Sequence, residues 1–196
     1  PYVLAWAHKK DSEHCYIGFD NQAAAQTITR QVLELGHRNL GVIVGLTQNN
    51  DRARDRITGI EHAIADHGAK TAPLQVIEAE YTFQEGAKAL VQLLANPTPP
   101  TAVICGNDVL AVGAVKRAKQ LGLAVPEDLS ITGFADIEVS ELIDPELTTV
   151  HVPHREMGIA AAKSLIAMLK TQTPVESHLL ETRIVNRQSL GPVKPH

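Results

Sequence analysis

The strongest constraint on the fold of this 196-residue chain is an alternation of short Val- and Ile-rich runs with amphipathic segments, almost from end to end. Strands of a parallel sheet are apolar on both faces, whereas an amphipathic helix repeats its apolar side chains every three or four residues. Alternation of the two with short loops is typical of a doubly wound, mostly parallel sheet with helices on both faces. We therefore expect an α/β fold with strands at residues 2–6, 15–19, 40–44, 74–79, 102–105, 130–134, 148–152 and 179–185.

Between these strands, the apolar spacing and the terminal residues predict helices. Asn21 is expected to cap a helix of residues 22–35, which Gly36 follows, and Asp108 is expected to cap the helix after the 102–105 strand. The last helix is apolar over a wider arc than a one-sided surface helix needs. The expected helices cover residues 22–35, 83–94, 108–121 and 156–169, with a further helix that ends near residue 68.

The composition excludes several classes of function. Lys and Arg number 18 against 22 Asp and Glu, giving a net charge of −4, whereas a chain that binds nucleic acid through its own surface needs clustered cations. No apolar run is long enough to span a membrane, and the first residues do not have the pattern of a signal peptide. The two cysteines, Cys15 and Cys105, stand far apart in apolar runs, which predicts buried free thiols in a reducing cytoplasm.

The motifs that mark common enzymes are absent from the sequence. It contains no GxxxxGK[ST] phosphate loop, no GxGxxG dinucleotide fingerprint and no GxSxG nucleophile elbow. His151 and His154 have the spacing of a metal pair, but Pro153 interrupts them at a strand-to-helix junction, where two imidazoles do not share one helix face. We therefore expect neither an enzyme nor a bound cofactor or metal.

Polar and aromatic residues follow the predicted strands at the edge where a doubly wound sheet binds its ligands. Arg52 and Arg56 lie one helical turn apart after the 40–44 strand, and they form either a solvated, salt-bridged first turn or a cationic site. Cations at a helix N-terminus oppose the helix dipole, which favours an anionic partner. The ends of other strands carry four further residues, Trp6, Tyr81, Asn107 and Asp136. The two aromatic residues fit a pocket wall or the core, and the asparagine fits a ligand contact or a turn.

Short motifs are spread over nearly the whole chain. They are Phe19-Asp20-Asn21, Gly36-His37-Arg38, Arg56-Ile57-Thr58-Gly59, Gly106-Asn107-Asp108, VPEDLSI at residues 125–131, Gly133-Phe134, Leu147-Thr148-Thr149-Val150 and Met157-Gly158. Each is weak alone, but together their order and spacing closely resemble the LacI/GalR family of bacterial transcription regulators.

This resemblance implies the effector-binding core of such a regulator, in a periplasmic-binding-protein-like fold whose two lobes enclose a ligand cleft. Residues 1–20 and 151–174 are then expected in an N-terminal lobe that is incomplete in this chain, and residues 21–150 and 175–196 in the C-terminal lobe. The implied partners are a small-molecule effector, a second copy of the chain, and operator DNA, bound through a headpiece not present here. A dimer contact is expected on helix 156–169, whose apolar arc would alternatively be covered inside a complete N-terminal lobe. The alternative function on the same fold is that of a periplasmic sugar-binding protein for transport.

The resemblance also assigns roles to the residues at the strand ends. Arg56 matches the arginine with which the family grips its effector, and Asn107 matches the family's cleft asparagine. Tyr81 matches a wall position, and Trp6 lies near another. Arg52 stands one turn from Arg56 and is expected to assist it.

Two positions depart from the family's pattern. Ala135 stands where the family usually has an aspartate that clasps sugar hydroxyls, and Val152 stands where a polar residue, often glutamine, is common. Asp136 keeps a carboxylate one position further along, where it faces a different direction. A cleft that lacks hydroxyl-binding groups but retains a guanidinium favours an organic acid over a neutral hexose. This departure from the usual pattern is similar to one in gluconate-responsive members of the family. The expected effector is therefore a sugar acid such as gluconate, with a phosphorylated sugar as the nearest alternative.

Overall fold

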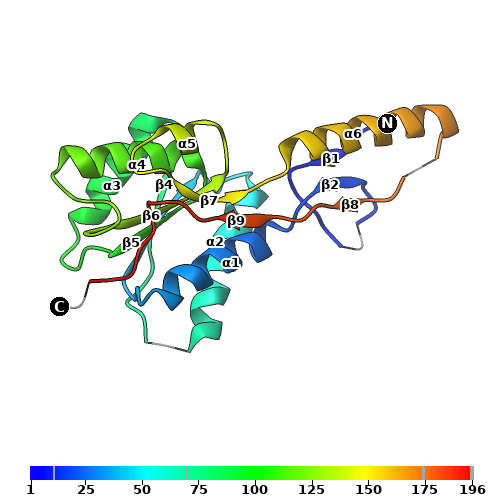
Figure 1. The fold of residues 1–196 in the computed structure, drawn as a ribbon. Coiled ribbons are helices and arrows are strands. Elements are labelled where there is room, and N and C mark those ends of the chain that lie inside the picture. The colour runs from blue at the N-terminus through cyan, green and yellow to red at the C-terminus, as the bar shows by residue number, and fades with distance from the viewer. Residues whose placement is uncertain (11, 69, 174, 195–196) are drawn as a thin grey trace.

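The structure, a computed structural model, describes residues 1–10, 12–68, 70–173 and 175–194 of the chain. Figure 1 shows a larger α/β unit from which a smaller arm projects. The larger unit contains a six-stranded sheet whose strands are, in spatial order, β4 (Gln75–Ala79), β3 (Leu40–Gly45), β5 (Ala102–Cys105), β6 (Ser130–Ala135), β7 (Thr148–His151) and β9 (Arg183–Val185). All its pairings are parallel except that of β7 with β9. This is the doubly wound, mostly parallel α/β architecture expected from the sequence.

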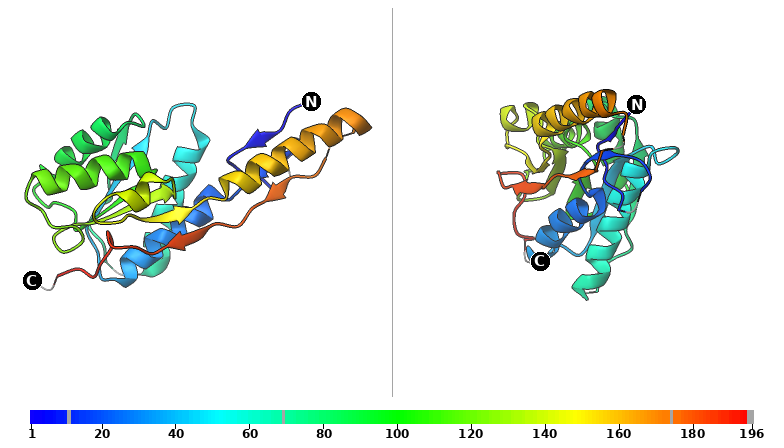
Figure 2. Two further views of the ribbon diagram at one scale, coloured as in Figure 1. Left: turned by 45° about the horizontal axis from the view of Figure 1, so that its top comes forward. Right: turned by 90° about the vertical axis from the view of Figure 1, so that its right-hand side faces the viewer.

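Two pairs of helices cover the six-stranded sheet, one pair on each face (Figures 1 and 2). The helices of the larger unit are α1 (Asn21–Glu34), α2 (Asp51–His67), α3 (Phe83–Leu94), α4 (Asp108–Gln120) and the short α5 (Val139–Leu142), which the sequence pattern did not predict. Successive strand side chains point to opposite faces, so Val42 and Val44 of β3 join the core of α1 and α2. Ile43 between them joins the core of α3 and α4.

The helices α3 and α4 approach so closely that glycines stand at their crossing. A Cβ atom at Gly86 would collide with the backbone of Leu110, and one at Gly113 would collide with the backbone carbonyl group of Phe83. The two glycines thus occupy reciprocal positions, one on each helix. The close packing of this helix pair depends on the absence of both side chains.

The arm is a three-stranded parallel sheet, β1 (Leu4–Ala5), β2 (Tyr16–Gly18) and β8 (His178–Leu179), in the order β1-β2-β8, with the helix α6 (His154–Thr171) packed beside it. The left view of Figure 2 shows α6 running along the arm away from the larger unit. Only Met157 and Ser164 of this helix are buried, and Ile159, Ile166 and Leu169 are exposed. No helix in the described part of the chain is long and apolar enough to cross a membrane.

The prediction of one strand at residues 179–185 was wrong, because this segment divides between the two sheets. His178–Leu179 pairs with β2 in the arm, and Arg183–Val185 pairs antiparallel with β7 in the larger unit. His178 and Leu179, which were expected in the C-terminal lobe with residues 175–196, thus pair within the arm. An apolar run predicts that a segment is extended, but it does not say which neighbour the segment pairs with.

The N-caps of α1 and α4 also differ from the sequence prediction, each by one residue. Asp20, not Asn21, caps α1 by accepting a hydrogen bond from the backbone N–H of Ala23 at 2.9 Å. Asn107, not Asp108, caps α4, with its Oδ1 accepting from the N–H of Leu110 at 2.9 Å. In both Asx–Asx pairs the first residue caps the helix, and the second side chain turns inward.

Candidate functional site

A pocket of about 280 Å³ opens at the carboxyl ends of the strands of the six-stranded sheet, where the arm meets it. Its lining residues come from the end of β1, the first turns of α2 and α4, the loop after β4 and the end of β6. They are Trp6, Arg52, Arg56, Tyr81, Asn107, Asp108, Val109, Phe134, Ala135 and Ile137. Five of the six residues expected at a ligand site, Trp6, Arg52, Arg56, Tyr81 and Asn107, are thus brought together, and Asp136 is not among the lining residues.

Two larger pockets, of about 760 and 560 Å³, lie along α6 in the arm. None of the residues expected at the site lines either of them. Because a small-molecule site needs a few polar groups that converge on one point, the smaller pocket is the better candidate.

Arg56 supplies a buried positive charge to the pocket. Its side chain is 8% exposed, with Nε donating to Oδ1 of Asn21 at 2.9 Å and Nη1 donating to the carbonyl oxygen of Gly106. The guanidinium carbon lies 4.0 Å from the centre of the Phe134 ring, in cation–π geometry. Burial lowers the pKa of the Arg56 guanidinium to about 10, so the group is charged at neutral pH. Within the part of the chain that the structure describes, Nη2 has no acceptor and no carboxylate forms an ion pair with Arg56.

The other polar lining groups are mainly hydrogen-bond donors. Arg52 lies one turn before Arg56 on α2, and its side chain is exposed. The amide of Asn107 uses Oδ1 to cap α4, which leaves its Nδ2 free of any partner among the described residues. The Tyr81 ring covers Gly45, where a Cβ atom would collide with it. The absence of a side chain at Gly45 therefore lets Tyr81 lie over the end of β3.

The one carboxylate in the lining is already satisfied by the protein. Oδ1 of Asp108 accepts from the hydroxyl of Thr149 at 2.5 Å, and Oδ2 accepts from the backbone N–H of Ile137 at 2.9 Å. Burial raises the pKa of this carboxyl group despite these hydrogen bonds. Asp108 therefore ties α4 to β7 and to the loop after β6, and the groups left for a ligand are cationic or neutral donors.

Trp6 forms the wall of the pocket on the side of the arm. Its backbone has a φ of 70°, a left-handed conformation that is rare for a bulky residue. Its carbonyl oxygen accepts a hydrogen bond from Nδ2 of Asn21 at 2.8 Å. Its ring packs at 5.0 Å against the ring of His154 and at 6.5 Å, edge-on, against Phe19. These contacts hold an unusual backbone in place, as is common at ligand sites.

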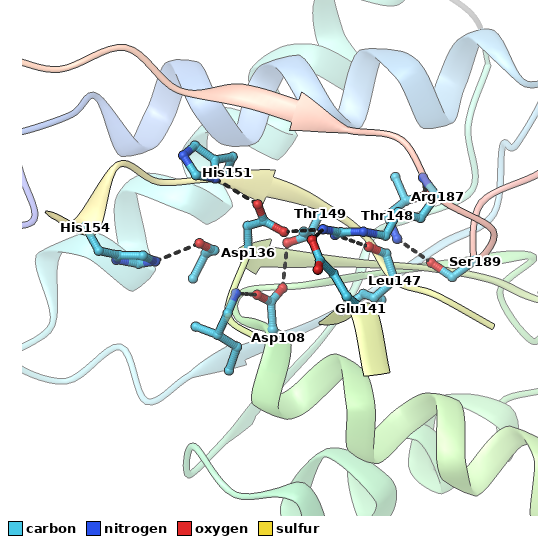
Figure 3. Close-up of polar contacts among 12 residues, drawn as sticks. Asp108, Asp136, Glu141, Leu147, Thr148, Thr149, His151, His154, Arg187 and Ser189 are labelled. Atoms are coloured by element: carbon cyan, nitrogen blue, oxygen red, sulfur yellow. Dashed lines mark hydrogen bonds and ion pairs between the residues drawn. The ribbon is translucent and has the colours of Figure 1, made fainter. Parts of the chain in front are cut away.

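Asp136 was expected to contact the ligand, but the structure places its carboxylate in an ion-pair network outside the pocket (Figure 3). Oδ2 lies 2.8 Å from Nδ1 of His151, and Oδ1 lies 2.8 Å from Nη2 of Arg187, which also pairs with Glu141 at 2.7 Å. The φ angles of 124° at Ala135 and 59° at Asp136 turn the chain sharply at the end of β6. This turn directs the carboxylate toward β7 and the C-terminal segment.

Replacing Asp136 with asparagine is expected to lower the free energy of unfolding at neutral pH by about 2 kcal/mol, because it removes a half-buried, ion-paired carboxylate. Burial opposes ionisation of Asp136, but the hydrogen bonds from His151 and Arg187 outweigh it and lower the pKa of the carboxyl group. A lowered folded-state pKa gives stability that is present above the unfolded value of about 3.9 and is lost as the pH falls through the folded value. The difference between the two proteins, measured by urea unfolding from pH 7 to pH 2, should therefore shrink in acid. Asp144→Asn, which changes an exposed carboxylate, is the control, and a pH-independent difference would contradict the prediction.

The two histidines with metal-like spacing have different partners. His151 contacts Asp136, and Nε2 of His154 lies 2.8 Å from the carbonyl oxygen of Ala135 (Figure 3). Since Ala135 and Trp6 both line the pocket, His154 links the first turn of α6 to the pocket wall. Val152 is fully buried and is not part of the lining.

Sequence reasoning missed two kinds of residue at the site. Apolar lining residues such as Phe134 and Ile137 had no signal beyond their place at, or just after, the end of a strand. Asn21 was interpreted as a helix cap and as part of a family motif, with no role at the site, although the structure shows that it bonds both Trp6 and Arg56. The signal that points to it is the preceding Asp20, which is able to cap the helix by itself.

Known proteins are similar to this chain in sequence and in fold. Residues 29–190 match the family described as the periplasmic binding protein-like domain. The HTH-type transcriptional repressor CytR of Escherichia coli K12 is 36% identical over 190 residues, which are 96% of this chain and 55% of that protein. The ribose operon repressor of Haemophilus influenzae is 33% identical over 169 residues, 85% of this chain and 50% of that protein. The chain thus spans about half the length of the curated relatives it matches.

The same relationship is found among solved structures. The crystal structure of a LacI family transcriptional regulator from Enterococcus faecium with bound ribose has a TM-score of 0.89 and 26% identity, covering 99% of this chain and 72% of that one. The family match spans most of the chain, and the relatives are named as repressors and as a LacI family regulator. The chain therefore belongs to the family of periplasmic-binding-protein-like domains, in the LacI/GalR group that its motifs resemble.

Proposed function

We propose that this chain is the effector-binding core of a LacI-type transcriptional regulator that acts in the cytoplasm. The arm belongs to the N-terminal lobe and the larger unit to the C-terminal lobe, with the pocket between Trp6 and the strand ends as the effector site. The relatives reported above are named repressors, which favours a regulator over a periplasmic transport protein. Operator DNA is bound by a part of the protein outside this chain, whose own net charge is −4.

The observation that carries the ligand assignment is the buried charge of Arg56, which forms no ion pair among the described residues. An arginine that is 8% exposed and has no carboxylate partner in the described structure leaves a positive charge to be neutralised by a ligand. A guanidinium with a free Nη2 suits a carboxylate or a phosphate. The pocket therefore selects a small anion.

The neutral donors of the pocket add a preference for hydroxyl groups. Nδ2 of Asn107 and the Tyr81 hydroxyl have no protein acceptor among the described residues, so each is free to bond a ligand oxygen. A volume of about 280 Å³ lies at the lower end of the range for ligand pockets, which suits a molecule of monosaccharide size. A sugar acid such as gluconate is the effector that best fits these features, and a phosphorylated sugar is the nearest alternative.

The effector acts by conformational linkage. The pocket has walls on both the arm and the larger unit, so a ligand that binds one relative arrangement of the two more tightly shifts the population toward it. The operator affinity then changes by the same free energy that couples the two sites.

Calorimetric titration of the protein with gluconate, glucose 6-phosphate and glucose tests the proposed ligand class. The two anions compete for one site, and we expect gluconate to bind at least about 30-fold more tightly than glucose, as a charge-assisted hydrogen bond implies. The operator affinity of the longer protein that includes the DNA-binding part, measured in parallel by fluorescence anisotropy, should change on adding gluconate. Tight glucose binding with no response to either anion would contradict the assignment.

We further expect a homodimer contact on α6. Ile159, Ile166 and Leu169 leave an exposed apolar face on this helix, which a second copy would cover. Sedimentation equilibrium at tens of micromolar should show a dimer for the wild type and a shift toward monomer for Ile166→Glu. Val91→Glu, which places the same charge on α3, is the control. A monomeric wild type would show instead that the face is covered within the N-terminal lobe.

A further inference from the structure

Asn21 joins the two walls of the pocket without lining it. Its Nδ2 donates to the carbonyl oxygen of Trp6 at 2.8 Å, and its Oδ1 accepts from Nε of Arg56 at 2.9 Å. The two bonds fix the orientation of the amide, because the flipped amide would place a donor against a donor and an acceptor against an acceptor. Asn21 is 3% exposed and is not among the lining residues, so it supports both walls from behind.

The start of α1 does not require an asparagine at this position. Asp20 supplies the N-cap hydrogen bond, which leaves the side chain of Asn21 to the pocket. The first turn of α1 carries no acidic residue, although a carboxylate there would be favoured by the helix dipole. Local helix energetics therefore favour aspartate over asparagine at position 21, and the asparagine is explained by the charge that it faces.

The charge that Asn21 faces is that of Arg56. Among the described residues, the hydrogen-bond and ring partners of the guanidinium are the amide of Asn21, the carbonyl group of Gly106 and the ring of Phe134, all of them neutral. The carboxylates of Asp55 and Asp108 favour the charged form from further away and form no ion pair with it. A carboxylate at position 21 would form an ion pair with Arg56, since the present Oδ1 already lies 2.9 Å from Nε. Such an ion pair would neutralise the cation before any ligand arrives.

We propose that Asn21 sets the charge preference of the pocket, because it positions Arg56 and Trp6 through a neutral amide and so leaves the guanidinium charge for an anionic ligand. Asn21 is a positioning residue and does not touch the ligand. The inference rests on the proposed function only for the class of ligand.

The first test is Asn21→Asp, which is nearly isosteric, adds one negative charge and loses the hydrogen bond to the Trp6 carbonyl oxygen, a loss that both ligands share. Calorimetry with gluconate and with ribose as a neutral probe should show the affinity for gluconate falling by about 30-fold or more and that for ribose by less than about threefold. Ala23→Asp adds the same charge on the exposed side of α1 and should leave both affinities unchanged. Equal losses for the two probes would reduce Asn21 to a structural role, and unchanged gluconate affinity would overturn the proposal.

The second test needs no ligand, so it separates a failure of this inference from a failure of the proposed function. In the wild-type background, Asn21→Asp loses the hydrogen bond to the Trp6 carbonyl oxygen but gains an ion pair with Arg56, so the two effects oppose each other and the change in Tm should be small. In an Arg56→Met background the same substitution buries an unpaired carboxylate and should lower the Tm by about 8 °C or more. Equal shifts in both backgrounds would refute the direct coupling of Asn21 to Arg56. If neither gluconate nor ribose binds the wild type, the proposed class of ligand is wrong. The comparison of Asn21→Asp in the two backgrounds still decides the role of Asn21.

Discussion

Replacing Arg56 with methionine is expected to weaken gluconate binding by about 30-fold or more, equivalent to about 2 kcal/mol. The substitution removes the buried cation of the pocket. The expected charge-assisted hydrogen bond between the guanidinium and the gluconate carboxylate is lost with it. Methionine fills a similar volume, so the change in affinity reports charge more than shape. Isothermal titration calorimetry gives the affinity directly.

Two variants make this result specific. Arg56→Lys keeps the charge but loses the planar fork that bonds Asn21, Gly106 and the ligand together, so an intermediate loss is expected. Arg54→Met removes an exposed arginine two residues earlier on the same helix, which bonds the carbonyl group of Thr47 and does not line the pocket. It should leave the affinity unchanged. Tight binding of a neutral sugar that is insensitive to Arg56→Met would show that the inference from the buried charge is wrong.

Replacing Gly113 with alanine is expected to lower the free energy of unfolding by about 3 kcal/mol. The same substitution inside an exposed helix normally stabilises a protein, by up to about 1 kcal/mol, because glycine is the more flexible residue in the unfolded chain. At Gly113 the new methyl group would collide with the backbone carbonyl group of Phe83, and a backbone cannot move aside as a side chain can. The helices α3 and α4 must then separate and lose part of their buried contact.

Gly158→Ala is the matched control for this prediction. It also lies within a helix, α6, but a Cβ atom there would have no described neighbour within 4 Å. It should raise the free energy of unfolding by about 0.5–1 kcal/mol. Chemical denaturation of both variants checks the opposite signs, and a stabilising effect at Gly113 would show that the helices are not in backbone contact there.

The order and type of most elements were predictable because hydrophobic periodicity is a local property. The strand at Ala102–Cys105 and the helix at Phe83–Leu94 have the expected limits, as their apolar runs end at prolines or polar residues. The assignment of β8 and β9 to different sheets was not predictable, because strand pairing depends on the path of the whole chain. The short α5 lacks enough turns to show a period.

The location of the pocket followed from a general rule of doubly wound sheets, but the direction of each side chain did not. Arg56 and Asn107 stand where that rule places ligand residues. Asp136 turns away from the pocket because the backbone at Ala135 and Asp136 has positive φ angles. Neither residue is a glycine, so the sequence does not suggest this conformation. Asn21 was misassigned because either member of an Asp–Asn pair can cap a helix, and only the tertiary structure decides which one does.

The division of the segment after α6 between two sheets also affects biosynthesis. β2 at residues 16–18 receives its second neighbour only when His178–Leu179 has been made, and β7 receives its outer neighbour only with Arg183–Val185. A few residues later, Ser189 bonds the backbone of both Ile131 and Thr148. Because a nascent chain folds from its N-terminus, these edges of β2 and β7 stay open on the ribosome until this one stretch emerges. Both edges then close within the synthesis of about a dozen residues, so the two halves of the molecule finish folding together.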